Sequence, residues 1–237
     1  MPTSTSTPER TTRERAPGER RAPGRRAAKV VAGTVVGGLV VWGIAAVVTG
    51  SSEGALEVSA EANVFGAGLD DPPDPGGGGG GVPPVLSRLP EGEQRVVTFP
   101  GVDGRVTPIE GFADPVGPGG DGGRYGTTDL DSSGGISGIA HRENGMFLVG
   151  VFLTDDPPQD EAPPRLDVTD VDTARPVAPE IGQTFLIGDG SDLRVAAPDE
   201  ATRLFLGFAD GYYYQEAPGW YDNNAGSVSV TVEVSTA

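Results

Sequence analysis

The chain has 237 residues, of which 38 are Gly and 22 are Pro. This share, about a quarter, exceeds that of one compact fold, so we expect one globular domain joined to Gly- and Pro-rich segments. The formal net charge of −17 excludes binding to nucleic acid, because phosphate recognition needs a basic surface. The absence of Cys excludes disulfides, thiolate metal sites and cysteine nucleophiles, and a single histidine, His141, excludes a multi-histidine zinc site.

The N-terminal part of the chain has the pattern of a membrane anchor. Residues 1–29 contain eight basic and three acidic residues, and residues 30–48 are uncharged and mostly apolar. A helix of these 19 residues is about 28 Å long, close to the hydrocarbon thickness of a bilayer. Because basic flanks stay in the cytoplasm, the sequence predicts a disordered cytoplasmic tail over 1–29, a single-pass transmembrane helix over 30–49 and an extracellular remainder. A cleaved signal peptide is the alternative.

Residues 50–94 have the composition of a linker. Six consecutive glycines, residues 76–81, lie between proline-containing stretches. Such a run neither nucleates a helix nor builds a strand ladder. The sequence therefore predicts a flexible spacer that contributes no apolar surface to a core.

Strand periodicity begins at about Arg95. The clearest case is residues 228–234, in which every second residue is valine, as in a strand with one buried face. No segment after the linker has helical periodicity over ten residues. Residues 95–237 are therefore predicted to form an all-β domain, an antiparallel β-sandwich. Further strands are predicted at 95–99, 136–140, 145–153, 166–169, 184–187 and 202–208.

Several C-terminal segments resemble a known family. These include Ala-Thr-Arg-Leu-Phe-Leu-Gly-Phe-Ala-Asp at 201–210, Pro-Gly-Trp-Tyr-Asp-Asn-Asn-Ala-Gly-Ser at 218–227, and the shorter segments 184–188 and 195–198. Together with the alternating last strand they are similar to the PA-IL-like galactophilic lectins. The resemblance implies a lectin-like β-sandwich that binds carbohydrate with the help of calcium.

The resemblance also implies a set of calcium ligands. Asp210, Asn223 and Asn224 would supply side-chain oxygens, and Trp220 and Tyr125 would supply backbone carbonyls. Calcium takes six to eight hard oxygen ligands, and a sugar with two neighbouring hydroxyls would complete the shell while hydrogen-bonding to Asp210 and Asn223. The alternative is that the two asparagines only form a turn before a strand.

Two features depart from the family. The loop after Asp210 is several residues longer and carries Tyr212, Tyr213 and Tyr214, which either stack on a pyranose face or pack the loop. The His and Gln that hold galactose in the family have no clear match, since the corresponding loop is residues 129–135. Galactose specificity is therefore not implied.

An enzyme is not expected. His141 has no GxSxG elbow or partner at motif spacing, and the EF-hand-like start at Asp129 has Ala140 where a bidentate Glu is needed. Two hypotheses remain: a membrane-anchored, extracellular, calcium-dependent carbohydrate-binding module, or an anchored structural or adhesion domain without sugar binding. Lys29 is the only lysine, and the preference for Arg, Ala, Gly and Pro is typical of bacterial proteins encoded by GC-rich genes.

Overall fold

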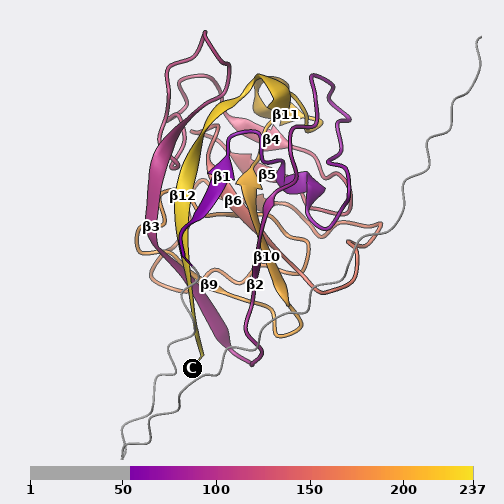
Figure 1. Cartoon of the computed structure of the whole chain (residues 1–237), viewed down its shortest axis with the longest axis vertical. Coiled ribbons are helices and arrows are strands. Elements are labelled where there is room, and N and C mark those ends of the chain that lie inside the picture. The colour runs from indigo at the N-terminus through magenta and orange to yellow at the C-terminus, as the bar shows by residue number, and fades with distance from the viewer. Residues whose placement is uncertain (1–53, 237) are drawn as a thin grey trace, which may run out of the picture. The chain divides into compact units, whose positions relative to one another are not determined.

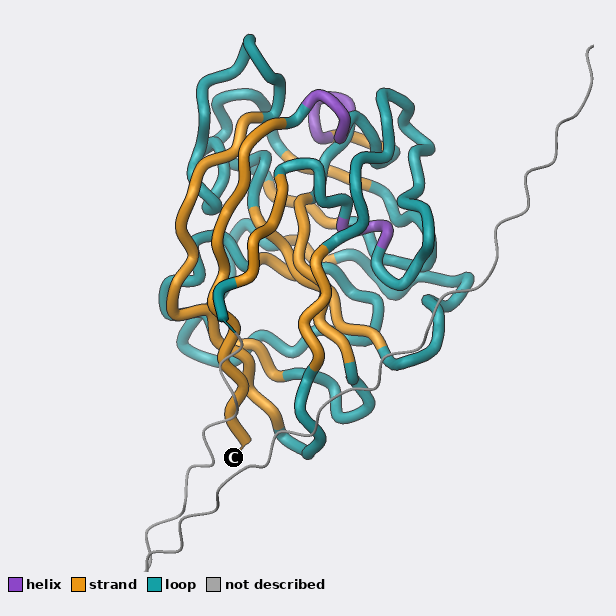
Figure 2. The backbone as a smooth tube through the Cα atoms, in the orientation of Figure 1, coloured by secondary structure: helices purple, strands orange, loops and turns teal. Residues whose placement is uncertain are grey.

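The computed structural model describes residues 54–236, which form an all-β fold with almost no helix (Figures 1 and 2). The predicted tail over 1–29 and the predicted anchor over 30–49 lie outside these residues. Within the part of the chain that is described, no helix is long and apolar enough to cross a bilayer. The elements are β1 (Leu56–Ser59), η1 (Val64–Gly66), β2 (Val85–Arg88), β3 (Arg95–Thr107), β4 (Thr128–Leu130), β5 (Ile139–His141), β6 (Leu148–Leu153), β7 (Leu166–Asp167), β8 (Phe185–Leu186), β9 (Arg194–Ala196), β10 (Arg203–Phe208), η2 (Tyr212–Tyr214), β11 (Gln215–Glu216), η3 (Tyr221–Asn223) and β12 (Ala225–Thr236).

The strands form three four-stranded sheets, with the orders β1-β12-β3-β9, β2-β10-β6-β8 and β11-β4-β5-β7. Every pair in the first two sheets is antiparallel. The third sheet is mixed, since β11 with β4 and β5 with β7 are parallel pairs. The predicted all-β class and the antiparallel pairing of the main sheets are thus confirmed, and the small mixed sheet is a feature that the sequence did not predict.

The alternating valines lie on β12, where the sequence places them. Val228 and Val230 are fully buried and Val232 is 5% exposed, while the residues between them are at least partly exposed. β12 is flanked by β1 and β3, so that Val228 lies opposite Val58 on one side and Gly104 on the other. A period of two on a central strand therefore places one face in the core.

Two hydrophobic cores hold the sheets together. The larger core takes its side chains from the first two sheets, including Val58, Val97, Val230, Phe152 and Leu204. The second core takes its side chains from β10, β6 and the small sheet, and all six residues of β6 are buried. β6 is therefore a strand between two cores, which explains its unbroken apolar sequence.

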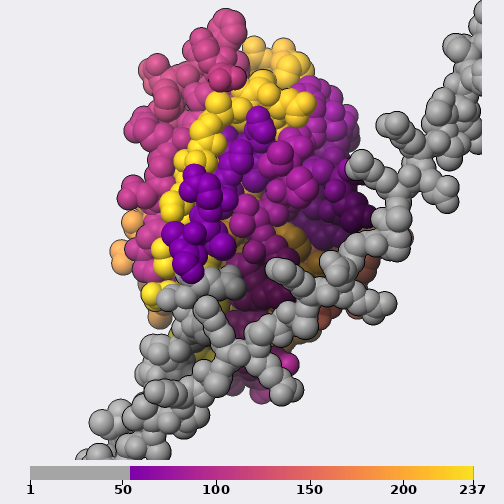
Figure 3. Space-filling view, in the orientation of Figure 1, coloured from indigo at the N-terminus to yellow at the C-terminus, as the bar shows by residue number. Residues whose placement is uncertain are grey.

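The predicted start of the β domain at residue 95 is wrong, because strands before this residue belong to the sheets. β1 and β2 are paired strands of the first two sheets, and Val58, Val64 and Phe65 are fully buried. Figure 3 shows the indigo and violet N-terminal part of the domain packed against the yellow β12. The short period-two run from Leu56 to Ala62 contributes apolar side chains to the core, and the glycine run after η1 is an irregular segment that contains a turn and a bend.

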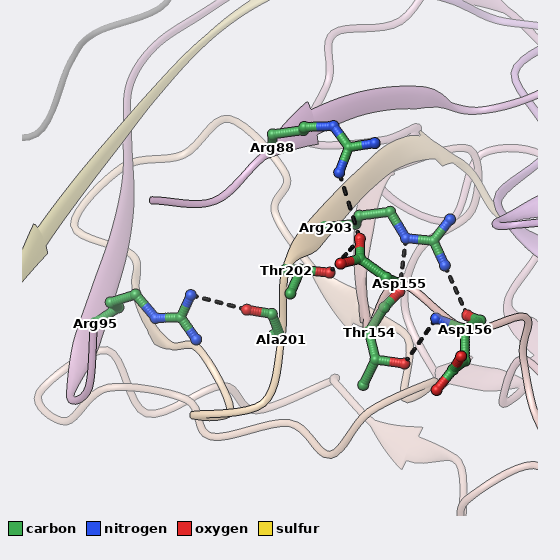
Figure 4. Close-up of polar contacts among 8 residues, drawn as sticks. All are labelled: Arg88, Arg95, Thr154, Asp155, Asp156, Ala201, Thr202 and Arg203. Atoms are coloured by element: carbon green, nitrogen blue, oxygen red, sulfur yellow. Dashed lines mark hydrogen bonds and ion pairs between the residues drawn. The ribbon is translucent and has the colours of Figure 1, made fainter. Parts of the chain in front are cut away.

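Arg95 closes one end of the sandwich. Its side chain is 2% exposed, and its guanidinium donates hydrogen bonds of 2.8–3.0 Å to the carbonyls of Pro90, Pro198, Asp199 and Ala201. Figure 4 shows the contact with Ala201 next to the polar network around Arg203. Because Arg95 pairs with Thr236, this end lies a full length of β12 away from the loop that precedes Ala225.

Candidate functional site

A pocket of about 320 Å³ lies at the other end of the sandwich, where β10 ends and β12 begins. Its walls bring together residues from three separate loops. Seven of the residues that line it belong to the predicted site, namely Tyr125, Asp210, Tyr212, Tyr213, Tyr214, Trp220 and Asn223. The last predicted residue, Asn224, contacts Asp210 directly.

Tyr221 fixes the two ends of the loop that carries this pocket. Its ring is fully buried, and its hydroxyl accepts a hydrogen bond of 3.0 Å from the backbone N–H of Asp210. The same hydroxyl donates to the carbonyl of Phe208, also at 3.0 Å. The residue that follows β10 and the short helix η3 before β12 are thereby held together across the loop.

Asp210 is a buried carboxylate without a cationic partner. It is 3% exposed, and no Arg or His among residues 54–236 forms an ion pair with it. Its Oδ1 accepts from the N–H of Gly211 at 2.7 Å, and its Oδ2 accepts from Nδ2 of Asn224 at 2.8 Å. Burial raises the pKa of Asp210 from 3.8 to about 7, despite these two hydrogen bonds. A bound cation would remove this penalty.

Two amide oxygens on the neighbouring residues Asn223 and Asn224 also lack a partner. Oδ1 of Asn223 and Oδ1 of Asn224 are buried and accept no hydrogen bond. Asn224 is 2% exposed, and its Nδ2 donates to Asp210 and to the carbonyl of Ala60. Buried polar atoms are normally paired, and unpaired acceptors beside a buried carboxylate suit a hard cation. Residues 54–236 hold no cluster of three or more His, Asp or Glu side chains.

Aromatic side chains form the rim of the pocket. Tyr212 and Tyr213 are 58% and 67% exposed, with ring centroids 4.6 Å apart, and the Tyr212 ring lies 5.2 Å from that of Trp220. Tyr213, Tyr214 and Trp220 have positive φ angles of 52°, 58° and 69°. Such backbone conformations cost of order 1–3 kcal/mol each and are common at binding sites.

Tyr214 differs from its two neighbours. It is 3% exposed and belongs to the larger core, where its ring lies against Gly145. Its hydroxyl is buried without a hydrogen-bond partner. Of the three tyrosines, two therefore face solvent and one packs, so that Tyr214 contributes to the wall of the pocket and not to its exposed rim.

Tyr125 reaches the pocket from a second loop. Its hydroxyl accepts from the N–H of Asp114 at 2.8 Å, and its own N–H donates to Oδ2 of Asp121 at 3.0 Å. A third loop supplies Pro108 and Ile109, which sequence reasoning did not select. The adjoining Glu110 donates its N–H to the carbonyl of Asn223 at 2.8 Å, which joins this segment to the site.

The other candidate residues lie elsewhere. Asp129 is part of β4 and pairs with Arg165, so that the EF-hand-like start is in a strand and not in a calcium-binding loop. His141 ends β5, with its ring 5.4 Å from that of Phe147, and burial lowers its pKa. A wider groove of about 1290 Å³ lies near Arg95, whose terminal nitrogens already donate to backbone carbonyls.

Comparison with known proteins adds no assignment. No protein-family model matches the sequence, and no curated protein matches it either.

Proposed function

We propose that this domain binds calcium in the pocket beside Asp210 and that the bound calcium helps to hold a carbohydrate. The observation that carries the proposal is a buried carboxylate without a cationic partner, Asp210, together with the unpaired amide oxygens of Asn223 and Asn224. These three side chains come from the two ends of one loop, which Tyr221 holds together. One carboxylate and two neutral amide oxygens suit a calcium ion and leave coordination positions free for further oxygen ligands.

The chemistry of such a site suits a sugar. Calcium would be held by Asp210, Asn223 and Asn224, with the carbonyls of Trp220 and Tyr125 as the further ligands implied by the family resemblance, and it would supply vacant positions for hydroxyl oxygens. Asp210 and Asn223 would accept hydrogen bonds from the same hydroxyls. The exposed rings of Tyr212 and Tyr213 present apolar faces on which a pyranose ring stacks.

The charge of the domain favours neutral glycans. Residues 54–236 contain nine Arg against 30 Asp and Glu. A strongly negative surface repels sialylated or uronic-acid glycans, with the strongest effect at low ionic strength. A neutral sugar with two neighbouring hydroxyls is therefore the proposed ligand class.

Calcium binding is the first test. Titration of the chelator-treated protein in a calorimeter should show one calcium site. At free calcium 100 times the dissociation constant, the gain in unfolding free energy is about 2.7 kcal/mol, which for a domain of this size raises the melting temperature by roughly 5–10 °C. Asp210→Ala should abolish binding, while Glu110→Ala, which removes an exposed carboxylate from the neighbouring loop, should preserve it.

Glycan retention separates the two functional hypotheses. On a glycan array the protein should be retained by neutral sugars in calcium and released by chelator, and Tyr213→Ala should weaken retention without changing calcium affinity. Calcium binding without any glycan retention would favour the structural or adhesion alternative. The side chain of Phe112, which is 90% exposed on the loop that also carries Ile109, is the observation that supports a protein partner in that case.

We further propose that the domain is held at the outer face of a membrane by residues 30–49. The support is the uncharged apolar run between a basic N-terminus and an acidic remainder. Protease added to intact cells should then remove the domain and leave a membrane-bound fragment. A domain that resists protease until the cells are lysed, or a soluble secreted form that begins near residue 50, would refute the anchor.

A further inference from the structure

The glycine-rich segment, residues 74–81, is bonded to the loop that carries the calcium pocket. Gly77 accepts a hydrogen bond of 2.8 Å from the N–H of Trp220, and Gly79 accepts one of 3.0 Å from the N–H of Tyr221. Two further bonds join the same segments: Gly76 N–H to the Pro218 carbonyl at 2.8 Å, and Gly81 N–H to Oδ1 of Asp222 at 2.9 Å. Four hydrogen bonds thus connect a run of glycines to residues 218–222.

The opposite side of this segment is fixed to the sandwich. Asn63 is fully buried, and its Nδ2 donates to the carbonyls of Pro73 and Gly80, both at 3.0 Å. The N–H of Asn63 donates to the carbonyl of Val82 at 2.9 Å. The glycine-rich segment is therefore held between Asn63, which follows β1, and the loop that carries the calcium pocket.

Side chains would not fit on the face that meets the pocket loop. A Cβ built on Gly78 would lie 2.5 Å from the ring of Trp220, and one built on Gly79 would overlap the carboxylate of Asp222. Carbon atoms pack at about 3.5–4.0 Å, so that the ring of Trp220 would have to retreat by about 1 Å. Gly77 has nothing within 4 Å of its Cβ position, although its φ of +73° is close to the +77° of Gly78.

We propose that the glycine-rich segment is the positioning element of the calcium pocket, an inference that rests on the proposed function. By contacting Trp220, Tyr221 and Asp222 it fixes the turn in which the backbone enters η3. This turn sets where Oδ1 of Asn223 and Oδ1 of Asn224 lie relative to Asp210. Because cation sites tolerate displacements of only about 0.5 Å, a shift of Trp220 changes calcium affinity as well as stability.

Gly78→Ala and Gly77→Ala form a matched pair for the test. Both introduce the same side chain at nearly the same left-handed φ, and only Gly78→Ala contacts Trp220. In the full chain, after the far-ultraviolet spectrum has shown that the metal-free variants are folded, calorimetric titration with calcium should give a dissociation constant at least tenfold higher for Gly78→Ala. The constant for Gly77→Ala should stay within about twofold of the wild-type value.

A second variant keeps the test decisive if Gly78→Ala does not fold. Gly79→Ala should also weaken calcium binding. Because Asp222→Ala removes the atoms that Cβ overlaps but also the acceptor of the Gly81 N–H, Gly79→Ala should weaken binding much less when it is added to Asp222→Ala than when it is added to the wild type. A segment that serves stability alone would lower the melting temperature in all variants and leave the calcium constant unchanged, which would overturn the proposal. If the wild-type protein binds no calcium, the proposed function fails and this inference with it; wild-type binding that Gly78→Ala and Gly79→Ala leave intact overturns the inference alone.

Discussion

A chain that begins at residue 95 is expected to lose cooperative folding, whereas a chain that begins at residue 54 is expected to keep it. The shorter chain lacks β1 and β2, which are paired with β12 and β10. It also lacks Val58, Val64 and Phe65, all fully buried. Burial of such side chains contributes about 1.5–3 kcal/mol each, and loss of three removes most of the roughly 5–15 kcal/mol by which a domain is stable.

Unfolding in urea, followed by circular dichroism, tests this expectation. The chain from residue 54 should show one sigmoidal transition, and the chain from residue 95 should show either no transition or a shallow one with a much smaller slope. The two transitions should not coincide. Equal midpoints and slopes would mean that β1, η1 and β2 are accessory to the fold and that the boundary at residue 95 was correct after all.

The sequence signals that succeeded were those with a clear period. The valines of β12 gave both the strand and its buried face, and the apolar run of β6 was identified because a strand between two cores has no polar face. β1 was missed because the strand has only four residues and because the small residues that follow it, Ala60 and Ala62, are uninformative about burial.

The glycine run was wrongly predicted to be a free spacer for a different reason. Glycine-rich composition is equally suited to a free spacer and to a segment that another backbone approaches closely. Gly78 and Gly79 are of the second kind, since Trp220 and Asp222 occupy the space in which their side chains would lie. The distinction depends on residues about 140 positions away in sequence, and no local pattern contains it.

The candidate site also contains residues that a local sequence pattern reveals and residues that only the fold brings in. Asp210, Asn223 and Asn224 were selected through a family resemblance in one C-terminal stretch, and the fold places them together. Ile109 and Pro108 reach the pocket only because the end of β3 lies beside the start of β12, where Thr107 opposes Ala225. Contacts of this kind follow from register between distant strands and not from composition.

In the absence of calcium the protein is expected to be less stable at pH 8 than at pH 5, because of Asp210. Burial raises the pKa of this carboxyl from 3.8 to about 7 in the folded protein. The folded state therefore binds more protons than the unfolded state between these two values. The contribution of the protonated carboxyl to the free energy of unfolding is fully present below pH 3.8 and is lost as the pH rises through 7. Its upper limit is about 4 kcal/mol.

This effect can be measured by unfolding the chelator-treated protein in urea at several pH values, with Asp210→Asn as the comparison. His141 acts in the opposite direction, because burial lowers its pKa and its contribution is lost as the pH falls. The difference between wild type and Asp210→Asn removes the contribution of His141 and of the other titrating groups. That difference should grow from pH 4 to about pH 7 and level off by pH 8, with the wild type becoming the less stable of the two.

Calcium should reverse the trend. A cation bound at Asp210 compensates the buried charge, so that the stabilisation by a fixed calcium concentration should increase from pH 5 to pH 8 as protons cease to compete for the carboxylate. Asp210→Asn should show little calcium stabilisation at either pH. If calcium stabilised the wild type equally at both values, the metal would be bound away from Asp210. If the chelated wild type and Asp210→Asn followed parallel curves, the carboxylate would be ionised and solvated in the folded protein, and the closed arrangement of Asp210 with Asn224 and Gly211 would not exist in solution.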